Sequence, residues 1–356
     1  MSLPILLLDG GLGTTLGSPP HNITFTSSTP LWSSHLLLSA PSTLTAVHRS
    51  FLTVGTDILL TATYQTSFEG FTRTDPKFTR DDAARYMRSA IPLARNAFGT
   101  HPDKPVRLAL SLGPYGATMS PVAAEYSGLY PEEMNSEDAL RKWHGERLRV
   151  FAEDDASWGT VEYVAFETVR RPDEVKAIRG TVRDILPRAK ERKPWWICGV
   201  FPAEEVDEDD VRRWVRAALG DSDSLPRPWG IGVNCTRVVN LGLIVDIMLD
   251  ELRKLIEQGQ LVDEWQTTSG RPWLVLYPDG TQGEEYDPAT KEWVQKRTEE
   301  NPQPWDEAYW DAVKKVKPGD WEGAILGGCC RAGPEHIAAL RRRVDRNTRF
   351  DKESNV

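Results

Sequence analysis

The sequence has 356 residues, of which 40% are hydrophobic and 27% charged, a composition typical of a globular protein and not of a disordered chain. The net charge of −9 argues against general binding to nucleic acid or anionic membranes. No apolar run approaches the roughly eighteen residues of a membrane helix. The apolar start of the chain has no basic leader, so we expect a buried strand there and not a signal peptide. Four cysteines, two of them adjacent, are too few for a disulfide scaffold and favour a reducing, cytoplasmic location.

Eight short apolar runs alternate with amphipathic stretches along the chain. In chain order the apolar runs are Ile5–Leu8, Asp57–Ala62, Val106–Leu112, Val161–Phe166, Trp195–Phe201, Trp229–Val233, Pro272–Tyr277 and Gly323–Leu326. Such near-continuous runs are typical of parallel strands covered on both faces. The helical patterns between and after them are Ser42–Val54, Asp81–Phe98, Ser136–Trp158, Pro172–Ile185, Asp207–Leu219, Leu241–Gln258, Asp306–Val316 and Pro334–Val344. Eight strand–helix units predict an α/β protein with the fold of a (β/α)8 TIM barrel.

The barrel is expected to be a single domain of residues 1–350, followed by a short polar tail at residues 351–356. Four polar stretches rich in Pro or Gly predict loops or insertions, and none is long enough for a linker between domains: Gly17–Pro30, Gly220–Pro228, Gln258–Arg271 and Thr298–Pro304. The sequence carries no clear sign of an oligomeric state, and a monomer is slightly favoured.

In such a barrel the functional groups gather at the C-terminal ends of the strands. Cys235 follows the sixth apolar run, and Cys329 and Cys330 follow the eighth. A catalytic zinc ion keeps three protein ligands and one open position, and thiolates are good zinc ligands. The trio therefore predicts a zinc site, although a single free cysteine is more often a small buried hydrophobic residue. We assign Cys198, which lies in mid-strand, to the core. Surface or capping roles are expected for the histidines, which show no ligand spacing: His21, His35, His48, His101, His144 and His336.

The first apolar run continues into Asp9-Gly10-Gly11-Leu12-Gly13-Thr14, and the fourth is followed by Glu167. The glycine-rich turn matches neither the P-loop nor the dinucleotide-binding pattern. Glycines do permit close backbone approach, with N–H groups directed at a small anion such as a carboxylate. The two acids beside this turn would suit a cationic amine. The alternative for each acid is a helix cap or an ion pair.

The sequence resembles a known family, the zinc-dependent homocysteine S-methyltransferases, which include betaine–homocysteine methyltransferase. The matching stretches run in order through nearly the whole chain: Leu8–Thr14, Val47-His48, Gly55–Ile58, Thr63–Gln65, Ser111–Ala117, Glu125–Gly128, Phe166–Thr168, Gly232–Thr236, Leu276–Pro278, Glu285–Asp287, Gly327–Arg331 and Gly333–Ile337. Each stretch is weak evidence alone, and the ordered set is specific.

The resemblance implies that Cys235, Cys329 and Cys330 hold Zn2+, with the homocysteine sulfur as the fourth ligand. It also implies that Asp9 and Glu167 receive the homocysteine amino group. The backbone of Gly11, Leu12, Gly13 and Thr14 would receive its carboxylate, and Asn234 is expected to contact the substrate as well. The sequence departs from the family at Ala62, where Asn is common, and in the longer segments at Pro19–Pro30 and Gly259–Arg271. It also lacks the C-terminal extension of the betaine branch.

We therefore expect an enzyme that moves a methyl group from a sulfonium to homocysteine and gives methionine. S-methylmethionine ranks first as the donor and S-adenosylmethionine second, because no adenosine-binding signature is recognisable. Four aromatic residues could face the cation: Trp32, Tyr64, Tyr115 and Tyr126. Three alternatives stay open: betaine as the donor, a barrel whose zinc is structural and serves a binding or regulatory role, and a thiol–redox protein using Cys329 and Cys330. The last is disfavoured because adjacent cysteines form strained disulfides.

Overall fold

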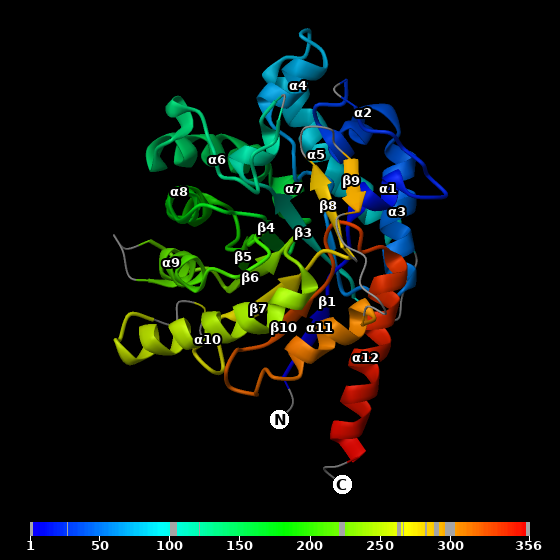
Figure 1. Ribbon diagram of the computed structural model, residues 1–356. Helices are drawn as coiled ribbons and strands as arrows, with labels where there is room; N and C mark the ends of the chain where they lie inside the picture. The colour runs from blue at the N-terminus through cyan, green and yellow to red at the C-terminus, as the bar shows by residue number, and fades with distance from the viewer. Residues whose placement is uncertain are drawn as a thin grey trace.

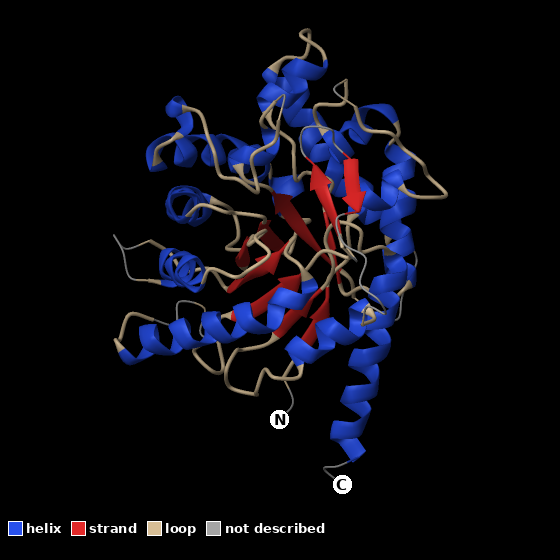
Figure 2. Cartoon of the chain, viewed as in Figure 1, coloured by secondary structure: helices blue, strands red, loops and turns tan. Residues whose placement is uncertain are grey.

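The computed structural model describes residues 3–26, 28–99, 105–120, 122–220, 225–261, 265, 267–281, 283–287, 292–295 and 303–353. Eight parallel strands form a barrel at the centre of the molecule (Figures 1 and 2). They are β1 (Ile5–Leu7), β2 (Ile58–Leu60), β3 (Arg107–Leu112), β4 (Tyr163–Phe166), β5 (Trp195–Gly199), β6 (Gly230–Asn234), β7 (Trp273–Tyr277) and β10 (Ala324–Leu326). Their order in the sheet is β1-β10-β7-β6-β5-β4-β3-β2.

The barrel closes between the two ends of this sheet. Leu8 forms a parallel bridge with Ile58, and the Asp9 N–H donates to the Ile58 carbonyl at 3.1 Å. The predicted TIM barrel is thus confirmed, and every strand lies within or one residue beyond a predicted apolar run. The runs are continuous because one set of side chains fills the barrel and the other packs under the helices.

The main helices surround the barrel (Figure 1). They are α3 (Pro41–Thr53), α5 (Arg80–Ala97), α6 (Glu137–Ala152), α8 (Pro172–Ile185), α9 (Glu208–Leu219), α10 (Leu241–Glu257), α11 (Trp305–Val313) and α12 (Pro334–Glu353). Helix α9 illustrates why they form: Val211, Trp214, Val215 and Ala218 are buried on one face, at the spacing of an amphipathic helix. Pro172 and Pro334 occupy first helical positions, where proline is tolerated. Helix α12 continues nine residues past the predicted end at Val344.

The helix predicted at Ser136–Trp158 is in fact two helices. Helix α6 ends at Ala152, and the short α7 (Asp155–Trp158) follows. The Asp154 carboxylate accepts a hydrogen bond from the Ser157 N–H at 2.9 Å, which caps the second helix. An Asp side chain that bonds to the backbone ahead of it begins a helix and so interrupts one that would otherwise continue.

Shorter helices, 3-10 turns and one hairpin lie between the main strands and helices. The short helices are α1 (Leu12–Gly17), α2 (Leu36–Ser39) and α4 (Phe68–Thr74), and the 3-10 turns are η1 (Trp32–His35), η2 (Tyr115–Thr118), η3 (Glu132–Met134), η4 (Leu186–Arg188) and η5 (Val238–Asn240). An antiparallel hairpin of β8 (Glu284–Asp287) and β9 (Glu292–Gln295) was not predicted; it follows β7. Figure 1 shows this hairpin at the opposite end of the barrel from the two chain termini.

Two layers of buried side chains make the core. The barrel interior contains Cys198, Trp196 and Val275, all with no exposed surface, and the assignment of Cys198 to the core is confirmed. A larger layer lies between the strands and the outer helices. Among the described residues, no helix is both long and apolar enough to cross a lipid bilayer.

The histidines differ in part from the expected surface or capping roles. His48 and His144 are each 1% exposed, so that expectation is wrong for both. His144 Nε2 lies 2.8 Å from Glu174 Oε1, whereas neither ring nitrogen of His48 has a partner in the described part of the chain. His336 does act as a cap, because its Nδ1 accepts from the Gly333 N–H at 3.2 Å. His101 lies outside the described residues.

Candidate active site

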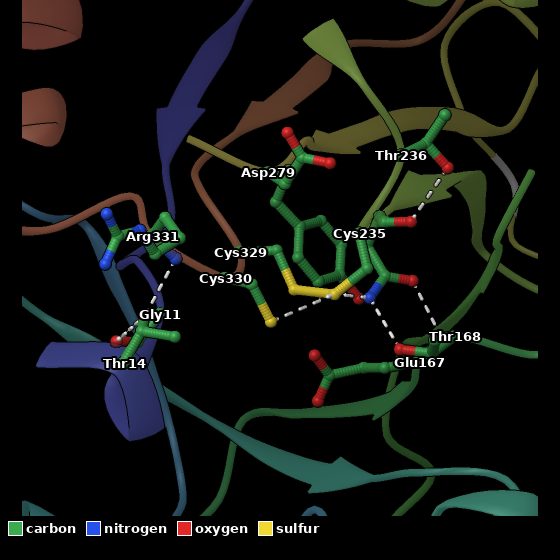
Figure 3. The surroundings of a disulfide bond; sticks show 12 residues. Gly11, Thr14, Glu167, Thr168, Cys235, Thr236, Asp279, Cys329, Cys330 and Arg331 are labelled. Atoms are coloured by element: carbon green, nitrogen blue, oxygen red, sulfur yellow. Dashed lines mark hydrogen bonds between the residues drawn. A yellow bond between two sulfur atoms is a disulfide. The ribbon is translucent and has the colours of Figure 1, made fainter. Parts of the chain in front are cut away.

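Three cysteine sulfurs meet at the C-terminal mouth of the barrel (Figure 3). Cys235 follows β6 and Cys329 and Cys330 follow β10, and the three sulfur atoms lie within 4.8 Å of one another. The end of β7 holds both loops, because the Tyr277 carbonyl accepts from the Cys235 N–H and the Pro278 carbonyl from the Cys329 N–H. Cys235 has a left-handed backbone, with φ of 47°, so the chain turns sharply where the strand ends.

The sulfurs differ from the three free thiols that the sequence analysis expected. Cys235 and Cys329 are joined by a disulfide, while Cys330 is free. The alternative disulfide between adjacent residues, Cys329–Cys330, is not formed. Because a metal binds thiolates, the disulfide must be reduced before all three cysteines can serve as ligands.

The geometry nevertheless fits a tetrahedral metal. Zinc–sulfur bonds of about 2.3 Å place two thiolate ligands about 3.8 Å apart, and the Cys235 and Cys330 sulfurs are 3.9 Å apart. Burial raises the pKa of Cys330 to about 12, so this thiol ionises at neutral pH only beside a cation. In the described part of the chain the cluster contains no fourth ligand, which leaves one position open.

Two buried carboxylates lie in the same mouth. Asp9 is 2% and Glu167 5% exposed. One Asp9 oxygen accepts from the Leu60 N–H at 3.0 Å, and the other has no partner. Glu167 accepts from the Ser111 hydroxyl. Burial raises the pKa of Glu167 to about 7, and burial together with the Glu167 charge raises that of Asp9.

No cation of the described chain forms an ion pair with either acid, and neither caps a helix. The alternatives of a cap or an ion pair therefore do not describe these two residues within that part of the structure. Buried carboxylates without a cation are unfavourable. A positively charged ligand group would relieve this cost, and the pair is a candidate site for an ammonium.

The glycine-rich segment after β1 begins a short helix. Gly11 precedes α1, and its own N–H donates to the Ala332 carbonyl at 2.9 Å, so that group is already used. Leu12, Gly13 and Thr14 form the first turn, whose N–H groups have no partner within the helix, and no side chain caps them. A Cβ on Gly11 would lie 2.3 Å from the Cys329 carbonyl oxygen. The glycine thus lets this segment approach the cysteine loop.

Asn234 is engaged with the loop after β4. Its side-chain oxygen accepts from the Thr168 N–H, and its amide donates to the Thr168 hydroxyl, both at 2.7 Å. Thr168 has a left-handed backbone with φ of 59°, directly after Glu167. The Asn234 amide also lies 3.8 Å from the Cys329 sulfur. Asn234 therefore connects the turn that carries Glu167 to the sulfur cluster.

The four aromatic candidates lie in different surroundings. Burial raises the pKa of Tyr64, and the charges of Glu125, Glu167 and Cys330 raise it further. Burial also raises the pKa of Tyr126, and the charges of Cys330 and Glu125 raise it further. These two tyrosines border the site.

The other two aromatic residues are less directly placed. Trp32 packs on α1, where a Cβ on Gly13 would lie 2.3 Å from its ring. Tyr115 contacts Tyr130 and Trp143 edge to face, with ring centroids 5.2 and 5.4 Å away. Tyr115 therefore belongs to an aromatic cluster against α6.

Several residues of the mouth were not predicted. The Tyr277 carbonyl accepts from the Cys235 N–H at 3.2 Å, and Asp279, whose pKa is raised by burial, lies beside the cysteines in Figure 3. Both stand at the end of β7, so the same strand-end rule could have found them. Glu125 is 8% exposed and one of its oxygens has no partner. It lies in a loop far from any strand end, and only its place in a matching stretch pointed to it.

Comparison with known proteins agrees with this geometry. The family model of homocysteine S-methyltransferase matches residues 6–344. Homocysteine S-methyltransferase 4 of Zea mays is 31% identical over 97% of this chain and 90% of its own length. Betaine-homocysteine S-methyltransferase of Drosophila melanogaster is 29% identical over 96% of this chain and 95% of its own length.

A solved structure has the same fold. The homocysteine methyltransferase MmuM from Escherichia coli, in its metallated form, superposes with a TM-score of 0.63 at 23% identity. The match covers 95% of this chain and 96% of that one. With a family model that spans almost the whole barrel, the chain belongs to the homocysteine S-methyltransferase family.

Proposed function

We propose that the protein transfers a methyl group from a sulfonium donor to the sulfur of L-homocysteine and so forms methionine. S-methylmethionine is the first candidate donor and S-adenosylmethionine the second. The observation that carries this proposal is the meeting of three cysteine sulfurs, within 4.8 Å of one another, with two buried acids that lack a cation. A metal site and an ammonium site side by side fit a substrate that has both a thiol and an amino group.

Cys235, Cys329 and Cys330 would hold Zn2+ once the disulfide is reduced. When bound, zinc lowers the pKa of a ligand thiol so that its sulfur is a thiolate at neutral pH. The cytoplasm, which we propose as the location, is reducing enough to keep cysteines as thiols. The metallated form of the Escherichia coli homocysteine methyltransferase supports the proposal of a metal in this protein. The open fourth position favours a catalytic metal over a purely structural one.

The protein's own groups would position homocysteine. Asp9 and Glu167 would accept hydrogen bonds from its ammonium, which supplies the positive charge that both acids lack. The first-turn N–H groups of Leu12, Gly13 and Thr14 would face its carboxylate, as expected at a helix N-terminus. Asn234 would hold the turn that carries Glu167 in a fixed position relative to the cysteines.

The transfer itself needs alignment more than proton transfer. The thiol proton of homocysteine leaves to solvent before the reaction. A sulfur lone pair then forms the new S–CH3 bond while the donor's S–CH3 bond breaks, and its electron pair stays on the donor sulfur. The donor departs as a neutral thioether, so no general acid is required. Holding the two sulfurs and the methyl carbon in line can contribute on the order of 7 kcal/mol.

The donor can be identified by direct comparison. Reduced, zinc-loaded protein is incubated with homocysteine and one of S-methylmethionine, S-adenosylmethionine or betaine, and methionine is quantified by chromatography. We expect the fastest turnover with S-methylmethionine. Faster turnover with betaine, the donor named for the Drosophila relative, would overturn the choice of a sulfonium. Absence of methionine with all three donors would overturn methyl transfer, and full activity of metal-free protein would overturn the zinc site.

A further inference from the structure

Glu125 is a third buried acid, and the proposed function uses only Asp9 and Glu167. It lies between η2 and η3, in a loop that folds back onto η2: the Gly116 carbonyl accepts from the Ala124 N–H at 2.9 Å. A Cβ on Gly116 would lie 2.7 Å from the Glu125 nitrogen, so only glycine allows this close approach. The folded-back loop buries the Glu125 side chain, which is 8% exposed.

The Glu125 carboxylate has no positive partner. One of its oxygens is buried without a hydrogen bond, and no ion pair in the described part of the chain includes it. Burial raises its pKa to about 7. Asp9 and Glu167 also have no positively charged partner in the described part of the chain, but the homocysteine ammonium would pair with those two. A second positive charge would therefore stabilise the ionised form of Glu125.

The loop that carries Glu125 lies at the mouth of the barrel. It folds onto η2, which follows β3, and the Gln65 amide after β2 donates to the Ala117 carbonyl of η2 at 2.7 Å. A Cβ on Gly113 would lie 2.7 Å from the Tyr64 ring, so Tyr64 packs beside the same segment, and Tyr126 is next to Glu125 in sequence. The Glu125 charge also raises the pKa of Tyr64 and of Tyr126, after the larger effect of burial. Aromatic side chains beside a carboxylate suit a cation that cannot itself donate hydrogen bonds.

We propose that Glu125, with Tyr64 and Tyr126, forms the receptor for the positive sulfonium centre of the methyl donor. This inference rests on the proposed function and adds to it the group that recognises the donor's charge. The amino group of homocysteine and the sulfonium of the donor would then have separate acidic partners in one mouth.

The chemistry dictates which kinetic constant Glu125 affects. As the methyl group moves, the positive sulfonium becomes a neutral thioether and the negative thiolate becomes a neutral thioether as well. A carboxylate beside the sulfonium therefore stabilises the bound donor more than it stabilises the transition state. An interaction that is stronger in the ground state lowers KM and also lowers kcat somewhat. We expect loss of the Glu125 charge to raise the donor KM and to raise kcat by a smaller factor, without lowering it.

The test compares a charged and a neutral ligand of the same shape. The neutral ligand is the carbon isostere of S-methylmethionine, in which a CH group replaces the sulfonium sulfur, so both ligands keep the same ammonium and carboxylate. At saturating homocysteine, Glu125→Gln should raise the KM of S-methylmethionine about tenfold and change the Ki of the isostere less than twofold. The control is Glu133→Gln, which alters an exposed acid in η3, the turn that follows this loop, and should change neither.

Each other outcome would overturn the proposal. An equal loss for both ligands would show that Glu125 serves the shared amino-acid group or supports the pocket, and no loss for either would show that it has no role in binding. A lowered thermal midpoint of Glu125→Gln without ligand would also indicate a structural role. If wild-type protein does not turn over S-methylmethionine, the proposed donor fails, and the Glu125 test continues with equilibrium dissociation constants of the same two ligands.

Discussion

Replacing Glu167 with glutamine should stabilise the ligand-free protein at alkaline pH and weaken its binding of homocysteine. Glu167 is 5% exposed, accepts a hydrogen bond from Ser111 and has no cation in the described part of the chain. Glutamine has the same shape, and its carbonyl oxygen can accept from the same hydroxyl. The substitution therefore removes one buried charge and little else.

The size of the stability effect follows from proton linkage. Burial raises the Glu167 pKa from 4.5 to about 7, a difference worth about 3 kcal/mol. Below pH 4.5 the carboxyl is protonated in the folded and the unfolded protein, so it does not affect stability. Between pH 4.5 and about 7 the carboxyl ionises in the unfolded protein and stays protonated in the folded protein, so wild-type stability falls across this range and levels off above it. We expect Glu167→Gln to remove this fall and to be up to about 3 kcal/mol more stable than wild type at pH 8.

Binding should change in the opposite direction. A charge-assisted hydrogen bond in a dry site contributes roughly 1.5–3 kcal/mol, so homocysteine should bind about ten- to a hundredfold more weakly to Glu167→Gln. Urea denaturation at pH 5 and pH 8 measures the stability, and calorimetry on reduced, zinc-loaded protein measures the affinity. Glu257→Gln, which alters an exposed acid at the end of α10, is the control. Unchanged affinity, or a variant less stable than wild type at pH 8, would refute this account of the acid.

Three further predictions, on the cysteines, Asn234 and Gly11, test the rest of the site. Reduced protein should bind about one zinc per chain by mass spectrometry; serine at any of the three site cysteines should abolish most of this, whereas Cys198→Ser, inside the barrel, should retain it. Asn234→Ala loses two hydrogen bonds to Thr168 and should lower the free energy of unfolding by about 1–3 kcal/mol, with a higher homocysteine KM; unchanged urea midpoints would contradict this. Gly11→Ala places a Cβ 2.3 Å from the Cys329 carbonyl and should weaken zinc binding in a competitive chelator titration; affinity equal to wild type would show that the loop shifts freely.

The barrel was predictable because its strands are buried on both faces. An apolar run such as Trp195–Phe201 contains no charged residue, and β5 covers its first five residues. The hairpin β8–β9 was not predictable in the same way. Its strands are four residues each and read Glu-Glu-Tyr-Asp and Glu-Trp-Val-Gln. Short polar strands of this kind carry neither the periodicity nor the apolar content by which a strand is identified from sequence.

The site residues that lie at strand ends were predictable from the sequence, and the others were not. Asp9, Glu167 and the three cysteines lie within four residues after the ends of strands, and the parallel barrel brings these strand ends to one mouth. The sequence could not show whether two of the cysteines form a disulfide, because a disulfide and a shared metal both require neighbouring sulfurs. Glu125 reaches the mouth through the fold of a long loop. That fold depends on contacts such as Gly116 against Ala124 and Glu125, which no local pattern reveals.

The three buried carboxylates of the mouth would let it bind two different ligands, each in its own position. Asp9, Glu125 and Glu167 are all buried, and none has a cation in the described part of the chain. Their raised pKa values record a cost that the folded protein carries when it is empty. If the proposed function is correct, each ligand supplies a positive group, the ammonium of homocysteine or the sulfonium of the donor, and would relieve a different part of that cost. Because the relief would depend on the position of each positive charge, the three acids would orient both substrates before any bond to the methyl group changes.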